Sequence, residues 1–187
     1  MMNKGDVVEI NIEAMLEGTD APVATECCIY KVPFNIRRHN EEAYTPKLVS
    51  IGPFHNGHPR LQDMESKKLF YCSAFIRRTK RNLDSLIHEI KEMEPDIRRC
   101  YSDTLEFSQK QLVKIILVDC VFILELFSRF SKINERKNDT CLSKPWWRNN
   151  IAFDLLLLEN QVPFFVLEKL FDLSFPSRSG GLRLFHN

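Results

Sequence analysis

The stretch FDLLLLENQVPFFVLEKLFDL, residues 153–173, decides which fold this chain can adopt. Its four consecutive leucines, 155–158, leave a helix no polar face, and such a helix is buried in a protein core or in a membrane. Polar residues and Pro163 interrupt the apolar run, which is therefore too short for one membrane-spanning helix of about 20 residues. We expect two short buried helices that meet at a corner: Leu155–Asn160, and a second helix with Pro163 in its first turn.

The polar residues at this corner, Glu159, Asn160 and Gln161, are the second feature of the stretch. A helix end leaves backbone N–H and C=O groups without partners inside the helix, and buried groups of this kind need side-chain partners. We therefore predict that these three side chains satisfy backbone groups where the helices meet, and that they take no part in catalysis.

Length, charge and cysteine content set outer limits on the function. The chain has 187 residues, which favours one domain, and a net charge of +1 gives no electrostatic reason for a nucleic-acid partner. No apolar secretory signal precedes the six cysteines, so we expect a cytoplasmic chain whose cysteines are reduced and mostly buried.

The part of the chain before residue 60 is rich in turns. Residues 7–17 fit a short helix, although their alternation also fits a strand. Four prolines and two glycines exclude a long helix from residues 26–59, while the many apolar residues there argue against disorder. We expect an ordered loop layer over the helices, with short extended pieces at Ile29–Val32 and Leu48–Ile51.

Two long helical patterns follow this layer. Apolar residues recur every three or four positions from Leu61 to about Met93, with a bend expected at Asn82–Asp84. Pro95 is expected to end this helix or to open a short turn. Phe107–Phe130 is predicted to be a central buried helix, because it is too short and too charged to span a membrane.

These patterns predict a mainly α fold with at most two short strands. The irregular helical domain covers residues 26–173, after a variable segment at 1–25 and before a short tail at 174–187. The polar residues 131–145 are expected to form a loop.

The turn Gly52–Pro59 carries the strongest hint of chemistry. Its glycine spacing matches the phosphate-binding pattern G-x-x-x-x-G-K-[ST]. However, His58 replaces the lysine of that pattern, Pro59 replaces its metal-binding hydroxyl, and Pro53 removes a backbone donor. We expect a tight turn that leads into a helix. A nucleotide-binding protein or enzyme using this turn with His55 and His58 is kept as the alternative.

Metal binding is the second candidate chemistry. His55 and His58, with Cys27, Cys28 and His39, supply only half of a zinc-ligand pattern, and polar loop residues are expected instead.

Charged residues give weaker signals. The basic run Arg77–Arg81 with Arg98–Arg99 lacks interleaved aromatic residues, so a solvated helix surface is expected and no nucleic-acid partner is predicted. Asp119 and Glu125 lie on different faces of the most apolar helix, and each is expected to bond an arginine or a neighbouring helix end. We predict no catalytic, cofactor-binding or metal-binding residues.

Several segments taken together resemble the plant family called domain of unknown function 247. They are CCIYKVP with AYTPKLVSIGPFHNG (27–57), LQDMESKK (61–68), LVDCVFILELF (117–127) and DLLLLENQVPFFVLEKLF (154–171). The chain departs from the family at Cys120-Val121, where relatives usually have Gly then Cys, and at His58, where they often have Lys.

The resemblance implies that the chain is a truncated member, matching the N-terminal half of the family domain. Full-length relatives commonly close with one membrane-spanning helix, so membrane contact is expected only if an anchor exists beyond residue 187. The family has no established enzymatic activity, and some grass members are implicated in pollen self-incompatibility. The leading hypothesis is therefore a non-enzymatic interaction or recognition module with an unidentified protein partner.

Two further expectations follow from truncation. An apolar patch around Phe164, Phe165, Leu167 and Phe171 is expected to be uncovered and to promote self-association through residues 153–173. A gene fragment without a selected function is kept as a further alternative.

Overall fold

A computed structural model describes residues 27–176, and the statements below concern that part of the chain. Its α-helices are α2 (Phe34–Arg37), α3 (Gln62–Thr79), α4 (Leu83–Arg99), α5 (Gln109–Phe130), α6 (Ile133–Asn138), α7 (Pro145–Asp154) and α8 (Phe164–Ser174). Short 3-10 helices lie at Glu41–Ala43 and Pro59–Leu61. The predicted mainly α class is confirmed. Within these residues, extended segments pair only at an isolated parallel bridge between Ile29 and Tyr101.

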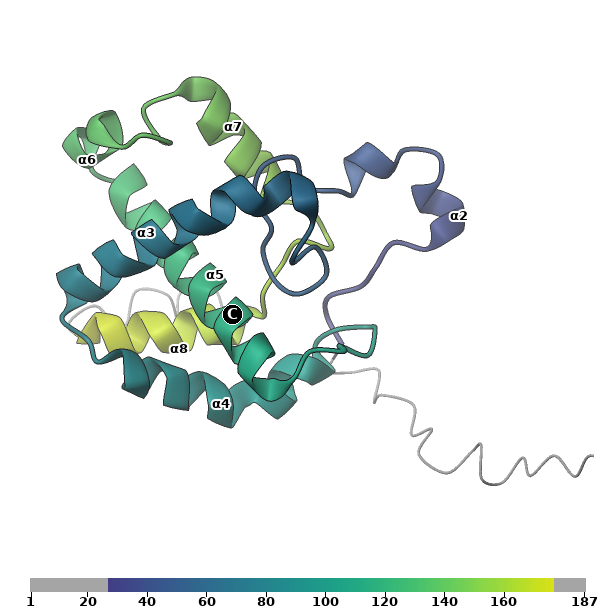
Figure 1. Cartoon of the computed structure of the whole chain (residues 1–187), viewed down its shortest axis with the longest axis horizontal. Helices are drawn as coiled ribbons and strands as arrows, with labels where there is room; N and C mark the ends of the chain where they lie inside the picture. The colour runs from purple at the N-terminus through teal and green to yellow at the C-terminus, as the bar shows by residue number, and fades with distance from the viewer. Residues whose placement is uncertain (1–26, 177–187) are drawn as a thin grey trace, which may run out of the picture.

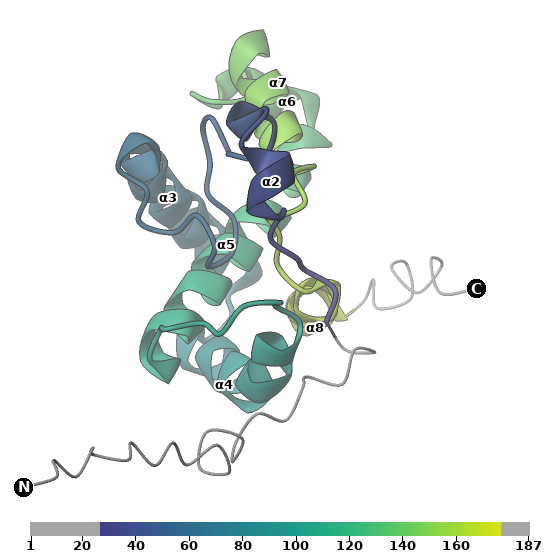
Figure 2. The same cartoon turned by 90° about the vertical axis from the view of Figure 1, so that its right-hand side faces the viewer.

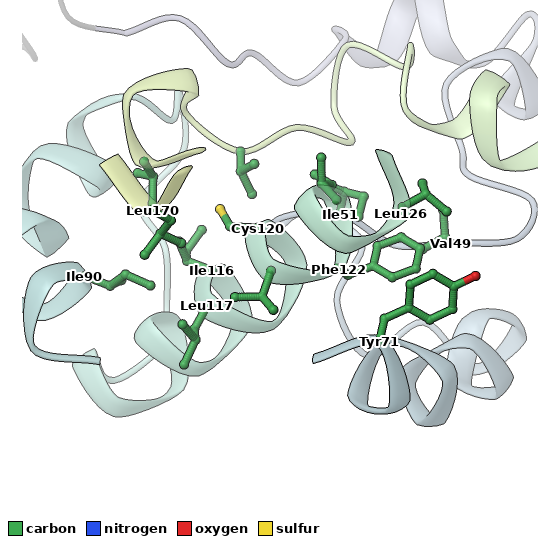
Figure 3. Close-up of a cluster of buried hydrophobic side chains, with 14 of the residues drawn as sticks. Val49, Ile51, Tyr71, Ile90, Ile116, Leu117, Cys120, Phe122, Leu126 and Leu170 are labelled. Carbon is green, nitrogen blue, oxygen red and sulfur yellow. The ribbon is translucent and has the colours of Figure 1, made fainter. Parts of the chain in front are cut away.

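Helix α5 is the centre of the molecule. Ser108 and Gln111 form a capping box at its start, close to the boundary predicted at Phe107. The helix then contacts α3, α4, α6 and α8, so its apolar residues are buried on nearly every side. Figure 3 shows Phe122 of α5 beside Tyr71 of α3, with Ile116 near Leu170 of α8. The Tyr71 and Phe122 rings meet edge to face, with centroids 5.1 Å apart.

Helices α3 and α4 replace the single bent helix that the sequence pattern predicted. Lys80 ends α3 in the left-handed region at φ 54°, and Asn82 caps α4 by accepting the Asp84 N–H at 2.9 Å. The bend expected at Asn82–Asp84 is therefore confirmed as a complete break between two helices.

The expectation that Pro95 ends the helix is wrong, because α4 continues through it to Arg99. A proline inside a helix removes one hydrogen bond and costs about 3 kcal/mol. Two features of the last turn offset this loss. Ile97 is completely buried, and the Arg98 guanidinium bonds Glu94 and the carbonyl oxygens of Leu105 and Phe107.

The predicted helix Leu155–Asn160 is also wrong. Helix α7 ends at Asp154, residues 155–163 form turns, and α8 begins after Pro163. The side chains of Asn160 and Gln161 bond carbonyl oxygens that a continuing helix would use, which explains why the helix stops. Leu156 and Leu158 consequently stay exposed, at 77% and 68%.

Two other predictions concern loops. The polar segment 131–145 contains the short helix α6, so the expectation of a loop throughout is wrong. The ordered layer before residue 60 is confirmed from residue 27 onward, while the helix expected at 7–17 lies outside the described residues. None of the helices between residues 27 and 176 is long and apolar enough to cross a membrane.

Figures 1 and 2 agree on the arrangement of the helices along the molecule. Helices α6 and α7 lie together at one end, and α4 lies at the opposite end, with α5 running between them. The C-terminal end of α5 therefore reaches the α6–α7 end.

Candidate functional site

The corner after α7 binds the backbone of the loop layer. The Asn160 side-chain oxygen accepts the Ile51 N–H at 2.7 Å, and its amide group donates to the carbonyls of Val49 at 3.0 Å and Asp154 at 2.9 Å. Gln161 donates to the carbonyls of Leu155 and Leu157, both at 2.8 Å. The structural role predicted for these residues is confirmed.

Asp154 also binds backbone groups of the loop layer, in the segment just before Ser50. Its carboxylate accepts the N–H groups of Lys47, Leu48 and Val49 at 2.9, 2.7 and 2.8 Å. A carboxylate can accept several such bonds, and each is stronger than a bond between neutral groups. This buried acid, which the sequence reasoning did not single out, therefore fixes the loop to the end of α7.

Glu159 forms a buried cluster with Arg37 and His55. Arg37 donates to both Glu159 oxygens at 2.6 and 2.5 Å, and Val32 N–H donates to one of them at 2.7 Å. His55 Nε2 lies 3.3 Å from the same carboxylate. Burial lowers the pKa of His55 more than the Glu159 carboxylate raises it, so the ring stays neutral. The His55 side chain is only 8% exposed and has no open face for a substrate.

The turn Gly52–Pro59 is a packing element in this structure. Gly52 has φ +74°, and a Cβ there would lie 2.2 Å from the Gln161 carbonyl oxygen. The Gly52 N–H, which a phosphate-binding loop would offer to its ligand, donates to Asp119 at 2.8 Å. His58 accepts the Arg60 N–H at 3.3 Å and caps the following 3-10 helix. Nothing in this geometry favours the nucleotide-binding alternative.

The other hint of chemistry from histidines concerned metal binding. Across residues 27–176, no group of three or more histidine, cysteine or acidic side chains is placed to hold a metal ion.

Asp119 and Glu125 lie in separate clusters. Asp119 bonds Lys68 at 2.6 Å, and Lys68 also lies 2.7 Å from Glu65. Burial opposes the charge on Lys68, but attraction by Asp119 outweighs it and raises the pKa of the lysine. Asp119 therefore pairs with a lysine and a loop N–H rather than with an arginine or a helix end.

Glu125 does pair with arginines, as predicted. It accepts from Arg78 at 2.6 Å and from Arg129 at 2.8 Å. Arg78 belongs to the basic run that was expected to be a solvated surface. That expectation holds for the exposed Arg77 and Arg81 and is wrong for Arg78, as it is for Arg98 in the second basic pair.

Asp139 is a buried acid that the sequence reasoning missed. It accepts the Tyr71 hydroxyl at 2.7 Å, the N–H groups of Cys141 and Leu142, and the Arg129 guanidinium at 2.9 Å. These donors overcome the effect of burial and lower the pKa of Asp139. An aspartate that begins a turn often accepts N–H groups two or three residues ahead, and that was the available signal.

A cleft between α3 and α5 has a volume of about 510 Å³. Its wall includes Glu65 and Gln111, which already bond Lys68 and Ser108. These two polar side chains are therefore engaged in contacts within α3 and at the start of α5.

An apolar groove lies between the C-terminal end of α5 and α7, with a volume of about 120 Å³. We call it the α5–α7 groove, and it is lined by Leu126, Phe127, Phe130, Leu142, Arg148, Ile151, Ala152 and Leu155. Phe127 is 59% exposed and Phe130 is 48% exposed, so the groove opens to solvent. Large aromatic rings left exposed beside a groove are typical of interaction sites.

The rim of the groove is basic. Arg136 stacks on the Phe130 ring at 5.5 Å, and Arg148 donates to the Leu142 carbonyl at 3.0 Å. Lys137 and Lys144 are exposed in the same segment. Of the two acids there, Glu135 pairs with Lys132 and Asp139 is buried against Arg129. The two arginines beside the groove therefore give its rim positive charge.

A family model and two curated relatives match most of this chain. The DUF247 family model, described as "Plant protein of unknown function", matches residues 29–185. The chain is 38% identical over 148 residues to UPF0481 protein At3g47200 of Arabidopsis thaliana. This match covers 78% of this chain and 31% of that protein. It is 33% identical over 176 residues to Putative UPF0481 protein At3g02645 of the same plant, covering 91% of this chain and 31% of that protein.

The chain thus spans about a third of the length of these curated relatives. No solved structure matches it.

Proposed function

The chain belongs to the DUF247 family of plant proteins, and we propose that it acts as a non-enzymatic interaction module. Its docking surface is the α5–α7 groove, and the partner segment is an amphipathic helix with an apolar face and acidic flanks. The observation that carries this proposal is the pair of exposed rings, Phe127 and Phe130, at the mouth of a groove with a basic rim.

The shape of the groove supports a helical partner. Two helix ends form its walls, and helices commonly insert apolar side chains from positions i, i+3 and i+4 into grooves of this kind. A volume of about 120 Å³ holds one or two such side chains rather than a cofactor. The partner helix would then cover Phe127 and Phe130.

The charges of the rim specify the polar flanks of the partner. Arg136 and Arg148 touch residues of the groove, and Lys137 and Lys144 are exposed in the same segment. Acidic side chains on the partner would complement these cations, speed association and disfavour basic competitors.

The arrangement of the buried polar residues supports a non-enzymatic role. Three buried acids each pair with a basic side chain: Asp119 with Lys68, Glu125 with Arg78, and Glu159 with Arg37. A catalytic group needs access to a substrate, and each of these acids is nearly completely buried.

Self-association is part of the same proposal and involves a neighbouring surface. Phe153, Leu156 and Leu158 are exposed at 69, 77 and 68%, so residues 153–173 do present apolar side chains. They lie earlier in the segment than expected, since Phe165, Leu167 and Phe171 are partly covered and Phe164 is the exposed member of that predicted patch. A recognition role like that implied for some grass relatives would be one use of these surfaces.

A designed peptide tests the proposal. The probe is a fluorescein-labelled helical peptide with leucines at i, i+3, i+4 and i+7 and glutamates on its flanks, titrated with the protein and followed by fluorescence anisotropy. We expect saturable binding in the micromolar range, weakened by salt, with at least about tenfold weaker binding of a lysine-flanked version. Equal binding of both peptides, or of neither, would overturn the proposal. Light scattering on the protein alone tests the self-association separately, and a monomer at every concentration would overturn that part of the proposal.

A further inference from the structure

Residues 28–31 run alongside residues 100–103, where α4 ends. The N–H groups of Cys28 and Ile29 both donate to the Cys100 carbonyl, at 3.0 and 2.9 Å, and Ser102 N–H donates to the Ile29 carbonyl at 2.9 Å. These bonds form the parallel bridge between Ile29 and Tyr101. Cys28 and Cys100 each precede one member of the bridged pair, and the Cys28 N–H bonds the Cys100 carbonyl directly.

The two thiols are close enough to react. The hydrogen bond from Cys28 N–H to Cys100 O, with standard bond lengths, keeps the two Cα atoms within about 7 Å, and disulfides span about 4.4–6.8 Å. The Cys28 side chain is also one of the neighbours that raise the pKa of the Cys100 thiol, as expected of two nearby thiols. We propose that Cys28 and Cys100 form a reversible disulfide, a thiol modification site that joins residues 28–31 to the end of α4.

The exposure of the two cysteines sets the order of the chemistry. Cys28 is exposed and Cys100 is buried, so Cys28 meets the oxidant first. With oxidised glutathione as the oxidant, the Cys28 thiolate attacks one sulfur, forms a mixed disulfide and releases one glutathione thiolate. The Cys100 thiolate then attacks the Cys28 sulfur and releases the second. Two protein thiols become one disulfide, and one oxidised glutathione becomes two reduced molecules.

The second step is slower and depends on pH. Burial, together with the neighbouring Cys28, raises the pKa of the Cys100 thiol to about 12. Since only the thiolate attacks, closure of the disulfide should speed up as the pH rises from 7 to 9. The first step involves an exposed thiol and does not wait for Cys100.

The disulfide would reinforce contacts that already hold this segment. Lys31 pairs with Asp103 at 2.9 Å, and Val32 N–H bonds Glu159 at 2.7 Å, which ties the same segment to the corner after α7. A covalent link between Cys28 and Cys100 closes a loop of about 70 residues in the unfolded chain and restricts it strongly. Oxidation should therefore stabilise the folded protein.

The experiment oxidises the whole purified chain with oxidised glutathione at pH 8 and measures the intact mass, the linked peptides and the melting temperature. We expect a mass about 2 Da lower, a peptide joining Cys28 to Cys100 and a melting temperature roughly 10 °C higher, all reversed by dithiothreitol. Cys28→Ser should lose all three changes, whereas Cys27→Ser, altered at the adjacent cysteine, should keep them.

Three outcomes would overturn the proposal: a peptide joining Cys27 to Cys100, a lasting glutathione adduct on Cys28, or no change in mass. Cys100→Ser provides a second arm, because it should trap glutathione on Cys28. If that buried variant fails to fold, the comparison of Cys28→Ser with Cys27→Ser still tests the proposal, because those two cysteines are exposed or partly exposed.

Discussion

Asn160 and Ile51 are far apart in the chain, yet the Asn160 side-chain oxygen accepts the Ile51 N–H at 2.7 Å inside the protein. This bond joins the loop layer to the corner between α7 and α8. Asn160 is completely buried, and its amide also donates to the carbonyls of Val49 and Asp154. Asn160 is therefore one of the buried residues, with Asp154 and Asp119, that hold the N-terminal loops on the helices.

Replacing Asn160 with alanine should destabilise the protein by about 3–5 kcal/mol, because three buried backbone groups lose their partners. Urea unfolding followed by circular dichroism measures this. Asn150→Ala is the matched control, since Asn150 donates only to the Trp146 carbonyl at 2.8 Å on the helix surface. It should cost less than about 1 kcal/mol, and equal losses in both variants would contradict the role given to Asn160.

Gly52→Ala should be far more disruptive than Gly57→Ala. Both glycines have positive φ, but a Cβ at Gly52 would lie 2.2 Å from the Gln161 carbonyl oxygen, while at Gly57 it would meet open space. We expect a loss of about 3–5 kcal/mol for Gly52→Ala, from backbone strain and overpacking together, and about 1 kcal/mol for Gly57→Ala, from strain alone. Thermal denaturation of the pair measures the difference, and similar melting temperatures would show that the turn is not packed on the corner.

Lys68→Met should cost about 3–5 kcal/mol, because it leaves the buried Asp119 carboxylate without its cation. Lys132→Met is the control, since that lysine pairs with Glu135 on the surface and should contribute less than about 1 kcal/mol. Urea unfolding at pH 7 compares them. A mild effect of Lys68→Met would mean that Asp119 becomes protonated or finds another donor.

His55 should make the protein less stable as the pH falls below 6.5. Burial lowers the folded-state pKa of His55 from 6.5, so the unfolded chain takes up a proton before the folded chain does. The stability from the neutral ring is fully present above pH 6.5 and is lost as the pH falls toward the folded-state pKa. His55→Gln should reduce the loss of unfolding free energy below pH 6.5, whereas a substitution at the exposed His39, His39→Gln, should not. Parallel curves for wild type and His55→Gln would contradict this.

The helices were predictable from sequence because their patterns are long. Helix α5 begins and ends within two residues of the predicted Phe107–Phe130, and a bend was predicted at Asn82–Asp84, where α4 begins. The failures occur where side chains compete with the backbone. Pro95 lies inside α4 because Ile97 is buried and Arg98 bonds the carbonyl oxygens of Leu105 and Phe107, and a helical periodicity does not reveal such contacts.

The corner stretch shows the same limit more clearly. Four leucines in a row predict a buried helix, yet the side chains of Asn160 and Gln161 take the carbonyl groups that the helix needed. The structural use of these polar residues was predictable, but their partners in the loop layer were not. The α5–α7 groove was missed altogether, because exposure of Phe127 and Phe130 depends on where α7 ends.

The measurement that tests the central claim most directly compares peptide binding to two variants. Phe130→Ser removes a ring of the groove that is 48% exposed, and Phe164→Ser removes a ring of nearly equal exposure, 47%, outside the groove lining. Anisotropy titrations with the acid-flanked helical peptide should show at least about tenfold weaker binding for Phe130→Ser and unchanged binding for Phe164→Ser, a difference of about 1.4 kcal/mol. Equal binding to both variants, with both shown to be folded, would contradict the account.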